Sequence, residues 1–367
     1  MKLGLQLGYW GAGPPENATE LVTEAERLGF DAVFAAESWG SDAFTPLAWW
    51  GSATRRVRLG TSVAQLSART PTGCAMHALT LDHLSGGRAV LGLGVSGPQV
   101  VEGWYGAPFK RPLARTREYV SIVRQVLERE KPVASDGPHY PLPYHGSGAE
   151  GLGKPLRPIT HPLRADLPIW LGAEGPRNVA LAAEIADGWL AVYYSLSLAP
   201  LYNEWLDEGF GRAGARRSRE DFEIAAGCQM VVTEDDAEIA AAYQGLKPVL
   251  ALYIGGMGAP EMNFHARLLS RVGYAEVLDE VGRLFRAGKR EEAAAAVPDE
   301  LVEEMAMIGS ADHVRSRVEQ WARAGVTMLQ VGCRDVRHAR VLAETLGLSG
   351  MGLSEMGPAG TRGLADK

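Results

Sequence analysis

The stretch of sequence that decides the fold runs from residue 81 to residue 98 and reads LDHLSGGRAVLGLGVSGP. Its first part completes a helical pattern that begins at Thr70-Pro71, and Gly86 stands where a glycine commonly closes a helix. Its second part, Ala89–Leu93, is a short apolar run of the kind that forms a strand in a parallel sheet. The glycines that follow let the backbone approach a ligand or another strand closely. The stretch therefore predicts one helix–strand step of an α/β fold.

The glycines at residues 92–97 also fit the Gly-x-Gly-x-x-Gly pattern of dinucleotide-binding folds. That pattern needs a helix directly after the glycines, whereas Pro98 follows here and the next firm helical pattern begins near Arg115. The acidic residue about twenty positions further on, Glu118, falls inside that helix and not at the end of a second strand, where it would hold a ribose. We therefore do not expect a Rossmann-type site.

Further apolar runs of the same kind lie on both sides of this stretch, and helical patterns separate them. This alternation is typical of repeated βα units with a parallel sheet. Eight such units match a (β/α)8 TIM barrel, with insertions, better than an open doubly wound sheet. The eight expected strands are Leu3–Leu7, Asp31–Ala35, Arg58–Ser62, Ala89–Leu93, Pro168–Leu171, Trp189–Val192, Glu223–Val232 and Thr327–Val331.

Several expected helices carry signals at their ends. Asn17, with Glu20 three residues later, resembles a capping box at the start of the first helix. Thr70 stands before Pro71, which suits the first turn of a helix. Ser310 can cap a late helix whose apolar residues recur at helical spacing.

Two segments interrupt the alternation of strands and helices. Residues 132–167 are rich in proline and glycine, so we expect an insertion without a continuous helix that can hold a hairpin at the mouth of the barrel. Residues 235–307 carry a long helical insertion. We expect residues 1–348 to form a single barrel domain, and residues 349–367, rich in glycine, methionine and serine, to form a loose tail.

Composition excludes several classes of function. The chain has 367 residues, and its 37 Lys and Arg against 44 Asp and Glu give a net charge of −7. This negative charge disfavours nucleic acid and anionic membranes as partners. Its 3 cysteines lie far apart and its 8 histidines lack metal-binding spacing, so we expect no disulfide framework and no metal site. The start lacks a secretory signal, and no run approaches the ~18 apolar residues of a membrane span. We expect a cytoplasmic enzyme that acts on a small molecule.

Candidate site residues lie where the expected strands end, because barrel enzymes place their chemistry there. Residues 172–178, GAEGPRN, form a glycine-rich turn that leads into a helix, whose free amides suit a phosphate, with Arg177 adding charge. A plain βα loop remains the alternative. Glu37 follows the second strand and suits a proton carrier, a cofactor anchor or a salt bridge. Trp10 and Trp39 offer flat rings to a planar ligand, with ordinary packing as the alternative.

Seven motifs along nearly the whole chain carry a resemblance to a known family. They are LGTSV at 59–63, LDHLSGGR at 81–88, LGLGVSGP at 91–98, EGWYG at 102–106, RTREY at 115–119, PIWLGA at 168–173 and ADGW at 186–189. In this order and spacing they resemble the bacterial-luciferase-like oxidoreductases, in particular the branch that depends on coenzyme F420. The resemblance implies a TIM barrel with a deazaflavin or flavin lying across its mouth, and relatives are often homodimers.

The resemblance also implies roles for individual residues. Ser62-Val63 corresponds to a bulge, with a cis peptide in many relatives, that supports the deazaflavin ring. Relatives that oxidise sugar phosphates have an Asp at the position of Glu37 and a catalytic His next to it; Ser38 stands there in this chain, so that substrate does not carry over. The cofactor-binding residues that the resemblance implies are Glu37, Ser62, Val63, Gln65, Val95, Ser96, Glu174, Gly175, Arg177 and Asn178.

The resulting functional hypothesis is hydride transfer between C5 of the deazaflavin and a small organic substrate, with Glu37 as the candidate catalytic residue that gives or takes a proton. Trp10, Trp39, Tyr193 and Tyr194 are the candidate substrate-pocket residues. One alternative is an FMN-dependent monooxygenase that uses reduced flavin and O2 on the same barrel. A second is a non-catalytic deazaflavin- or flavin-binding protein.

Overall fold

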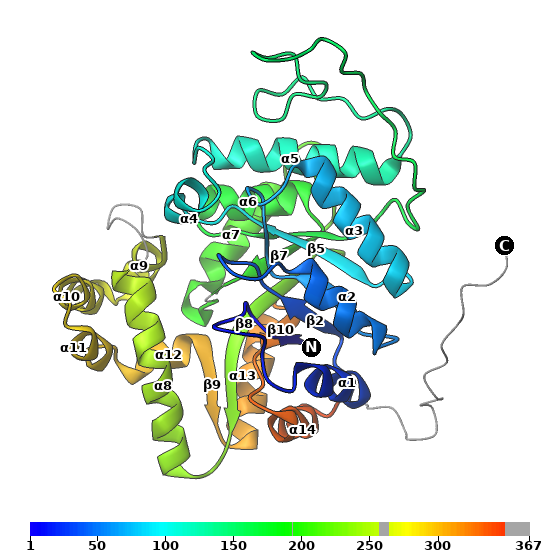
Figure 1. The fold of residues 1–367 in the computed structure, drawn as a ribbon. Coiled ribbons are helices and arrows are strands. Elements are labelled where there is room, and N and C mark those ends of the chain that lie inside the picture. Colours follow the sequence, from blue (N-terminus) through cyan, green and yellow to red (C-terminus); the bar gives the residue numbers. More distant parts are fainter. Residues whose placement is uncertain (193, 257–263, 349–367) are drawn as a thin grey trace.

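The computed structural model describes residues 1–192, 194–256 and 264–348, and it contains a closed barrel of parallel strands surrounded by helices (Figure 1). All eight strands expected from the sequence are present, with ends that shift by at most one residue. They are β1 (Lys2–Gln6), β2 (Ala32–Ala35), β3 (Arg58–Thr61), β5 (Ala89–Gly94), β6 (Ile169–Gly172), β7 (Gly188–Ala191), β8 (Glu223–Val232) and β10 (Met328–Val331).

The barrel closes because β10 pairs in parallel with both β1 and β8. Two further short strands were not expected. β4 (Ala64–Gln65) continues the line of β3 after a break and pairs with the end of β5, and β9 (Ala306–Gly309) pairs with the second half of β8. The predicted (β/α)8 TIM barrel is therefore confirmed.

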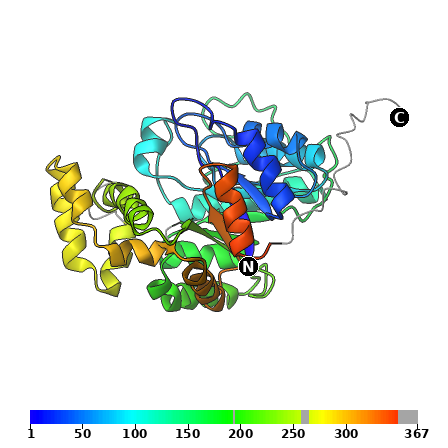
Figure 2. The ribbon, with the colours of Figure 1, turned by 90° about the horizontal axis from the view of Figure 1, so that it is seen from below.

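Helices cover the outside of the barrel (Figures 1 and 2). Thr70 caps its helix by accepting a hydrogen bond from the Gly73 N–H at 3.2 Å, as expected, and Ser310 does the same for His313 at 3.2 Å. Asn17 has φ 54° and makes no side-chain cap, so the predicted capping box is wrong. These outer helices are α1 (Ala18–Leu28), α2 (Phe44–Ser52), α3 (Pro71–Ser85), α4 (Pro98–Gly103), α5 (Pro112–Glu128), α6 (Pro176–Ile185), α7 (Ala199–Phe210), α13 (Ala311–Arg323) and α14 (Val336–Thr345).

The glycines of β5 serve close strand packing. A Cβ on Gly92 would lie 1.9 Å from the carbonyl oxygen of Thr61, so no other residue fits there. The Thr61 hydroxyl bridges the two strands, accepting from the Gly92 N–H at 2.9 Å and donating to the Gly92 carbonyl at 2.7 Å. The interior of the barrel is filled by one apolar layer that consists of Ala32, Phe34, Val90, Trp170, Leu190, Ala225 and Met328.

The expected helical insertion forms a group of helices beside the barrel, connected to it through the paired end of β8 and β9 (Figures 1 and 2). No described helix is long and apolar enough to cross a membrane. The insertion helices are α8 (Asp236–Gly255), α9 (Phe264–Leu269), α10 (Ala275–Arg286), α11 (Arg290–Ala295) and α12 (Asp299–Met305). A single domain over residues 1–348 stays a prediction, and the expected tail, 349–367, lies outside the described residues.

The other insertion, residues 132–167, has no helix and makes two isolated antiparallel bridges. It leads from the end of α5 to the start of β6, so both of its ends lie at the barrel end opposite the mouth, where Arg164 pairs with Asp82 at 2.7 Å. Its middle runs along α5 (Figure 1), and Tyr140 there contacts the buried ring of Tyr119 edge-on. The two ends of the insertion therefore lie opposite the mouth, because a helix leads back to the start of the next strand, while its middle reaches Arg115 in the first turns of α5. A hairpin at the mouth stays a prediction.

Candidate active site

A polar layer lies above the apolar interior, at the end of the barrel where the strands finish. Gln330 of β10 and Met328 are two residues apart and so share the inner face. The Gln330 Oε1 accepts from the Gln6 Nε2 at 3.4 Å and from the Ser62 Oγ at 3.1 Å. Side chains from three strand ends therefore meet at the mouth.

The break between β3 and β4 forms the expected bulge, and the peptide bond Ser62–Val63 is cis. Beyond the break, the Val63 side chain lies against two glycine positions of neighbouring strands. A Cβ on Gly94 would come within 2.5 Å of Val63 Cγ2, and one on Gly172 within 3.0 Å of Val63 Cγ1. The glycines at the ends of β5 and β6 thus make room for Val63 above the barrel interior.

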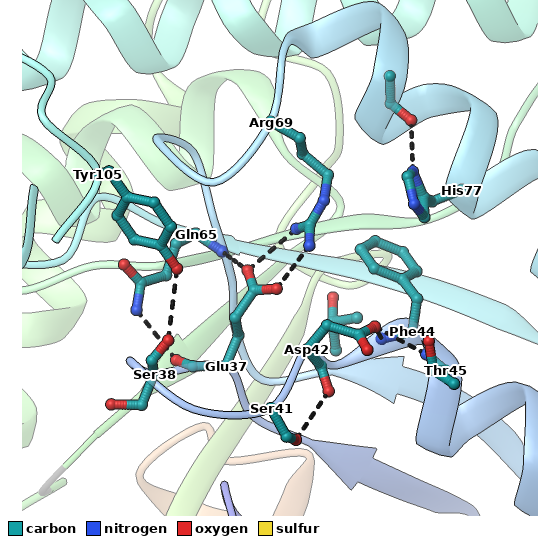
Figure 3. Close-up of polar contacts among 12 residues, drawn as sticks. Glu37, Ser38, Ser41, Asp42, Phe44, Thr45, Gln65, Arg69, His77 and Tyr105 are labelled. Carbon is teal, nitrogen blue, oxygen red and sulfur yellow. Dashed lines mark hydrogen bonds and ion pairs between the residues drawn. The ribbon is translucent and has the colours of Figure 1, made fainter.

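Glu37 holds this bulge through three hydrogen bonds, and Figure 3 shows those with Gln65. Its backbone N–H donates to the Val63 carbonyl at 3.1 Å. Its Oε2 accepts from the Gln65 backbone N–H at 2.8 Å, and its carbonyl oxygen accepts from Gln65 Nε2 at 3.1 Å. One residue at the end of β2 therefore fixes the chain on both sides of Ala64.

The carboxylate of Glu37 is also in a buried ion pair. Arg69 Nη2 donates to Oε1 at 2.6 Å and Nη1 donates to Oε2 at 3.0 Å, and the Glu37 side chain is only 4% exposed. The Arg69 guanidinium lies over the Phe44 ring at 5.1 Å, and the Tyr105 hydroxyl donates to the Ser38 carbonyl at 3.3 Å (Figure 3). The sequence suggested three roles for Glu37: a proton carrier, a cofactor anchor or a salt bridge. This geometry favours the salt bridge. Its partner, Arg69, is a site residue that the sequence did not single out.

The loop after β6 joins a glycine turn to the start of α6, as the sequence predicts. Gly175 is the residue before the helix and has φ 75°, a conformation that favours glycine. Pro176 takes the first helical position, and the amides of Arg177 and Asn178 follow in the first turn, where a helix offers N–H groups without intrahelical partners. Arg177 is exposed, so its side chain can reach a bound anion.

Glu174 stands at the end of this strand in a different environment. Burial raises the pKa of its carboxyl to about 8. The residue lines a small cavity of about 30 Å³ together with Trp189 and Tyr202 of the barrel and Leu250 of the helical insertion. Burial therefore favours the protonated carboxyl, and in that form it would not repel an anion bound at the adjacent helix start.

Four more of the predicted site residues lie near the ends of β5, β1 and β2. Val95 and Ser96 are partly buried at the end of β5, and Ser96 has φ 59°, an uncommon conformation for a residue with a side chain. Trp10 lines an open cleft of about 910 Å³ between the loops after β1 and β2, and Trp39 is 61% exposed in the second of these loops.

Tyr194 lies in the core, contrary to the expectation that it lines a substrate pocket. It is 2% exposed and packs among the rings of Trp189, Tyr202 and Trp321. Tyr193 lies outside the described residues. No group of three or more metal-ligating side chains occurs among the residues that the structure describes.

The fold and this arrangement can be compared with known proteins. A family model described as luciferase-like monooxygenase matches residues 4–328. The chain belongs to the luciferase-like monooxygenase family. The family resemblance that the sequence motifs indicate is thus confirmed.

Individual proteins are also similar to this chain over most of their length. A protein of Mycobacterium tuberculosis, provisionally named a coenzyme F420-dependent oxidoreductase, is 67% identical over 343 residues, which cover 94% of this chain and 98% of that protein. The 5,10-methylenetetrahydromethanopterin reductase of Archaeoglobus fulgidus is 30% identical over 312 residues, covering 85% and 87%. The solved structure of the coenzyme F420-dependent tetrahydromethanopterin reductase from Methanopyrus kandleri shares the fold with a TM-score of 0.77 at 22% identity, covering 94% and 98%.

Proposed function

We propose that the protein is a coenzyme F420-dependent oxidoreductase that transfers a hydride between C5 of the deazaflavin and a small organic substrate. The observation that carries the proposal is the pairing of two features at one end of the barrel. The first is an apolar seat where Val63 stands against Gly94 and Gly172. The second is the glycine-initiated start of α6 at Gly175. The names of the 67% and 30% identical relatives agree with this chemistry.

The residues of the mouth fit such a cofactor. A ring with carbonyl and N–H groups needs an apolar face and a few polar partners, and the buried Gln65 Oε1 has no hydrogen-bond partner among the described residues. The cofactor phosphate needs donors, which the first turn of α6 and Arg177 offer. Bound coenzyme F420 supplies a ring carbon that gives or accepts a hydride.

The chain itself provides position and exclusion of water. Val63 would back the ring, and Glu37 and Arg69 fix the bulge that presents Val63. The loops after β1 and β2, which carry Trp10 and Trp39, would exclude water from the open side. Because the Glu37 carboxylate already accepts from Arg69 and Gln65, we assign Glu37 to positioning. Turnover and cofactor affinity of Glu37→Gln distinguish this positioning role from the proton-carrying role that the sequence suggested.

Two other functions share this geometry. An FMN-dependent monooxygenase uses a ring and a phosphate of the same kind, and the family description favours it as the second candidate. A non-catalytic deazaflavin- or flavin-binding protein would need the same seat. Action on a small-molecule substrate, a homodimeric state and a cytoplasmic location also stay proposals.

Titration of the purified protein with oxidised F420 and, separately, with FMN tests the proposal. We expect F420 to bind at least tenfold more tightly than FMN, measured from the change in cofactor absorbance and fluorescence. Tighter binding of FMN contradicts the proposal and favours the monooxygenase. Rapid mixing of the F420 complex with candidate substrates then distinguishes an enzyme, which changes the redox state of the cofactor, from a binder, which does not.

The proposed phosphate site has its own test. Arg177→Ala is expected to weaken F420 binding about tenfold, as for the loss of one charge-assisted hydrogen bond, and to leave unchanged the binding of a deazaflavin fragment that lacks the phosphate. Arg323→Ala, at an exposed arginine at the end of α13, is the matched control. Equal losses for F420 and for the fragment would contradict a phosphate contact at Arg177.

A further inference from the structure

The side-chain amide of Gln330 has a fixed orientation. The Gly8 backbone N–H donates to Gln6 Oε1 at 3.0 Å, which leaves Gln6 Nε2 to donate to Gln330 Oε1. Ser62 Oγ donates to the same oxygen. The Ser62 hydroxyl can donate or accept, but Gln6 Nε2 can only donate, so a flipped Gln330 amide would place its N–H groups against the N–H groups of Gln6. The backbone of β1 therefore determines, through Gln6, which way the Gln330 amide points.

This orientation leaves a buried donor without a partner. Gln330 is 6% exposed, and its Nε2 has no hydrogen bond in the part of the chain that the structure describes. Such a group costs free energy unless an acceptor reaches it. The next inward-facing residue of β10 toward the interior is Met328, which belongs to the apolar layer with Phe34 and Trp170. An acceptor for this amide therefore has to enter from the mouth.

The position of this donor relates it to the proposed ring seat. Ser62, whose hydroxyl contacts Gln330, directly precedes Val63 at the bulge. A planar ring placed against Val63 brings its edge beside the Ser62–Gln330 pair. The edge of a deazaflavin or flavin ring carries carbonyl oxygens, which are good acceptors for an amide N–H.

We propose that Gln330 is a cofactor-binding residue whose Nε2 donates a hydrogen bond to a ring carbonyl oxygen of the bound deazaflavin or flavin, with Gln6 and Ser62 as positioning residues that orient it. The proposal rests on the proposed function for the location of the ring, and it does not depend on whether the ring is F420 or FMN, since both carry such carbonyls. It adds a residue of β10 to a site otherwise built at the ends of β2, β3, β5 and β6.

The experiment measures dissociation constants of F420, of FMN and of the phosphate-free deazaflavin fragment for three variants and the wild type. Gln330→Met removes the donor at similar length, and Gln330→Glu keeps acceptor oxygens for Gln6 and Ser62 but loses the donor. Gln244→Met, at an exposed position of α8, is the control. Thermal unfolding without cofactor shows whether each variant is folded.

We expect both Gln330 variants to weaken binding of F420 and of the fragment by about tenfold, in step, and to shift the absorption band of the bound ring. Arg177→Ala, by contrast, is expected to weaken binding of F420 and to leave binding of the phosphate-free fragment unchanged. If the wild type binds FMN more tightly than F420, the proposed F420-dependent function is contradicted. The role of Gln330 is then decided by the affinities of the same variants for FMN. Unchanged ring affinity and spectrum in a folded Gln330→Met overturn the proposal. If Gln330→Met does not fold, Gln330→Glu gives the same decision.

Discussion

Replacing Glu37 by glutamine keeps the size of the side chain but removes its charge. The pair that it forms with Arg69 is buried, with side-chain exposures of 4% and 15%. Removing one partner of a buried ion pair costs roughly 3–5 kcal/mol, since it leaves the other charge uncompensated. Because Arg69 keeps some access to solvent and its contact with the Phe44 ring at 5.1 Å, we expect the lower end, about 3 kcal/mol.

The loss has a second consequence at the bulge. Glutamine can place an N–H2 where Oε2 accepts from the Gln65 backbone N–H, so the segment that presents Val63 is held less firmly. Urea unfolding and the dissociation constant of F420 are the two measurements, and we expect Glu37→Gln to lower both stability and cofactor affinity. Arg69→Met is expected to do the same, and the double variant to lose at least about 1 kcal/mol less than the sum of the two single losses.

The opposite pattern of results would refute this reasoning. If Glu37→Gln leaves stability and F420 affinity at wild-type values and lowers turnover alone, Glu37 carries a proton in the reaction and is not a positioning residue. Equal stability losses that simply add in the double variant would show that the pair is not coupled, contrary to its geometry.

Three further predictions concern the stability of the barrel. Burial raises the pKa of the Glu174 carboxyl to about 8 from 4.5. The contribution of this group to stability is therefore fully present below about pH 4.5 and is lost as the pH rises through about 8. Glu174→Gln should remove that part of the pH dependence, measured by urea unfolding between pH 5 and pH 9. Asp187→Asn should cost about 3 kcal/mol in the same assay, because three arginines donate to this buried carboxylate. Gly92→Ala should abolish folding or cost more than ~3 kcal/mol, because its Cβ would lie 1.9 Å from the Thr61 carbonyl oxygen, whereas Gly103→Ala, with nothing within 4 Å, is the control that leaves the thermal transition unchanged.

The barrel could be predicted from the sequence because its strands leave a simple pattern. Each buried parallel strand is a short apolar run, and its neighbouring turns and caps carry glycine, proline or a hydroxyl, as at Thr70 and Ser310. The two-residue strand β4 has too few residues to show any pattern. Asn17 fails as a cap because its backbone takes φ 54°, which the residue type permits but does not reveal.

The site could be predicted only in part. The loop at Gly175 was found because a turn followed by a helix start is a local signal. The partner of Glu37 was not found from the sequence, because Arg69 comes 32 residues later in a different loop. Only the closed barrel brings the two side chains together. Gln330 looks like an ordinary residue of an apolar run, and its unpaired amide follows from contacts with residues 324 and 268 positions away.

The placement of the cofactor is the central claim, and a crystal structure of the protein with coenzyme F420 bound tests it most directly. We predict that the deazaflavin ring lies against Val63 with a ring carbonyl oxygen within 3.5 Å of Gln330 Nε2, and that the phosphate contacts the amides of Arg177 and Asn178. A ring bound away from the bulge, or a phosphate held elsewhere than the start of α6, would contradict the account.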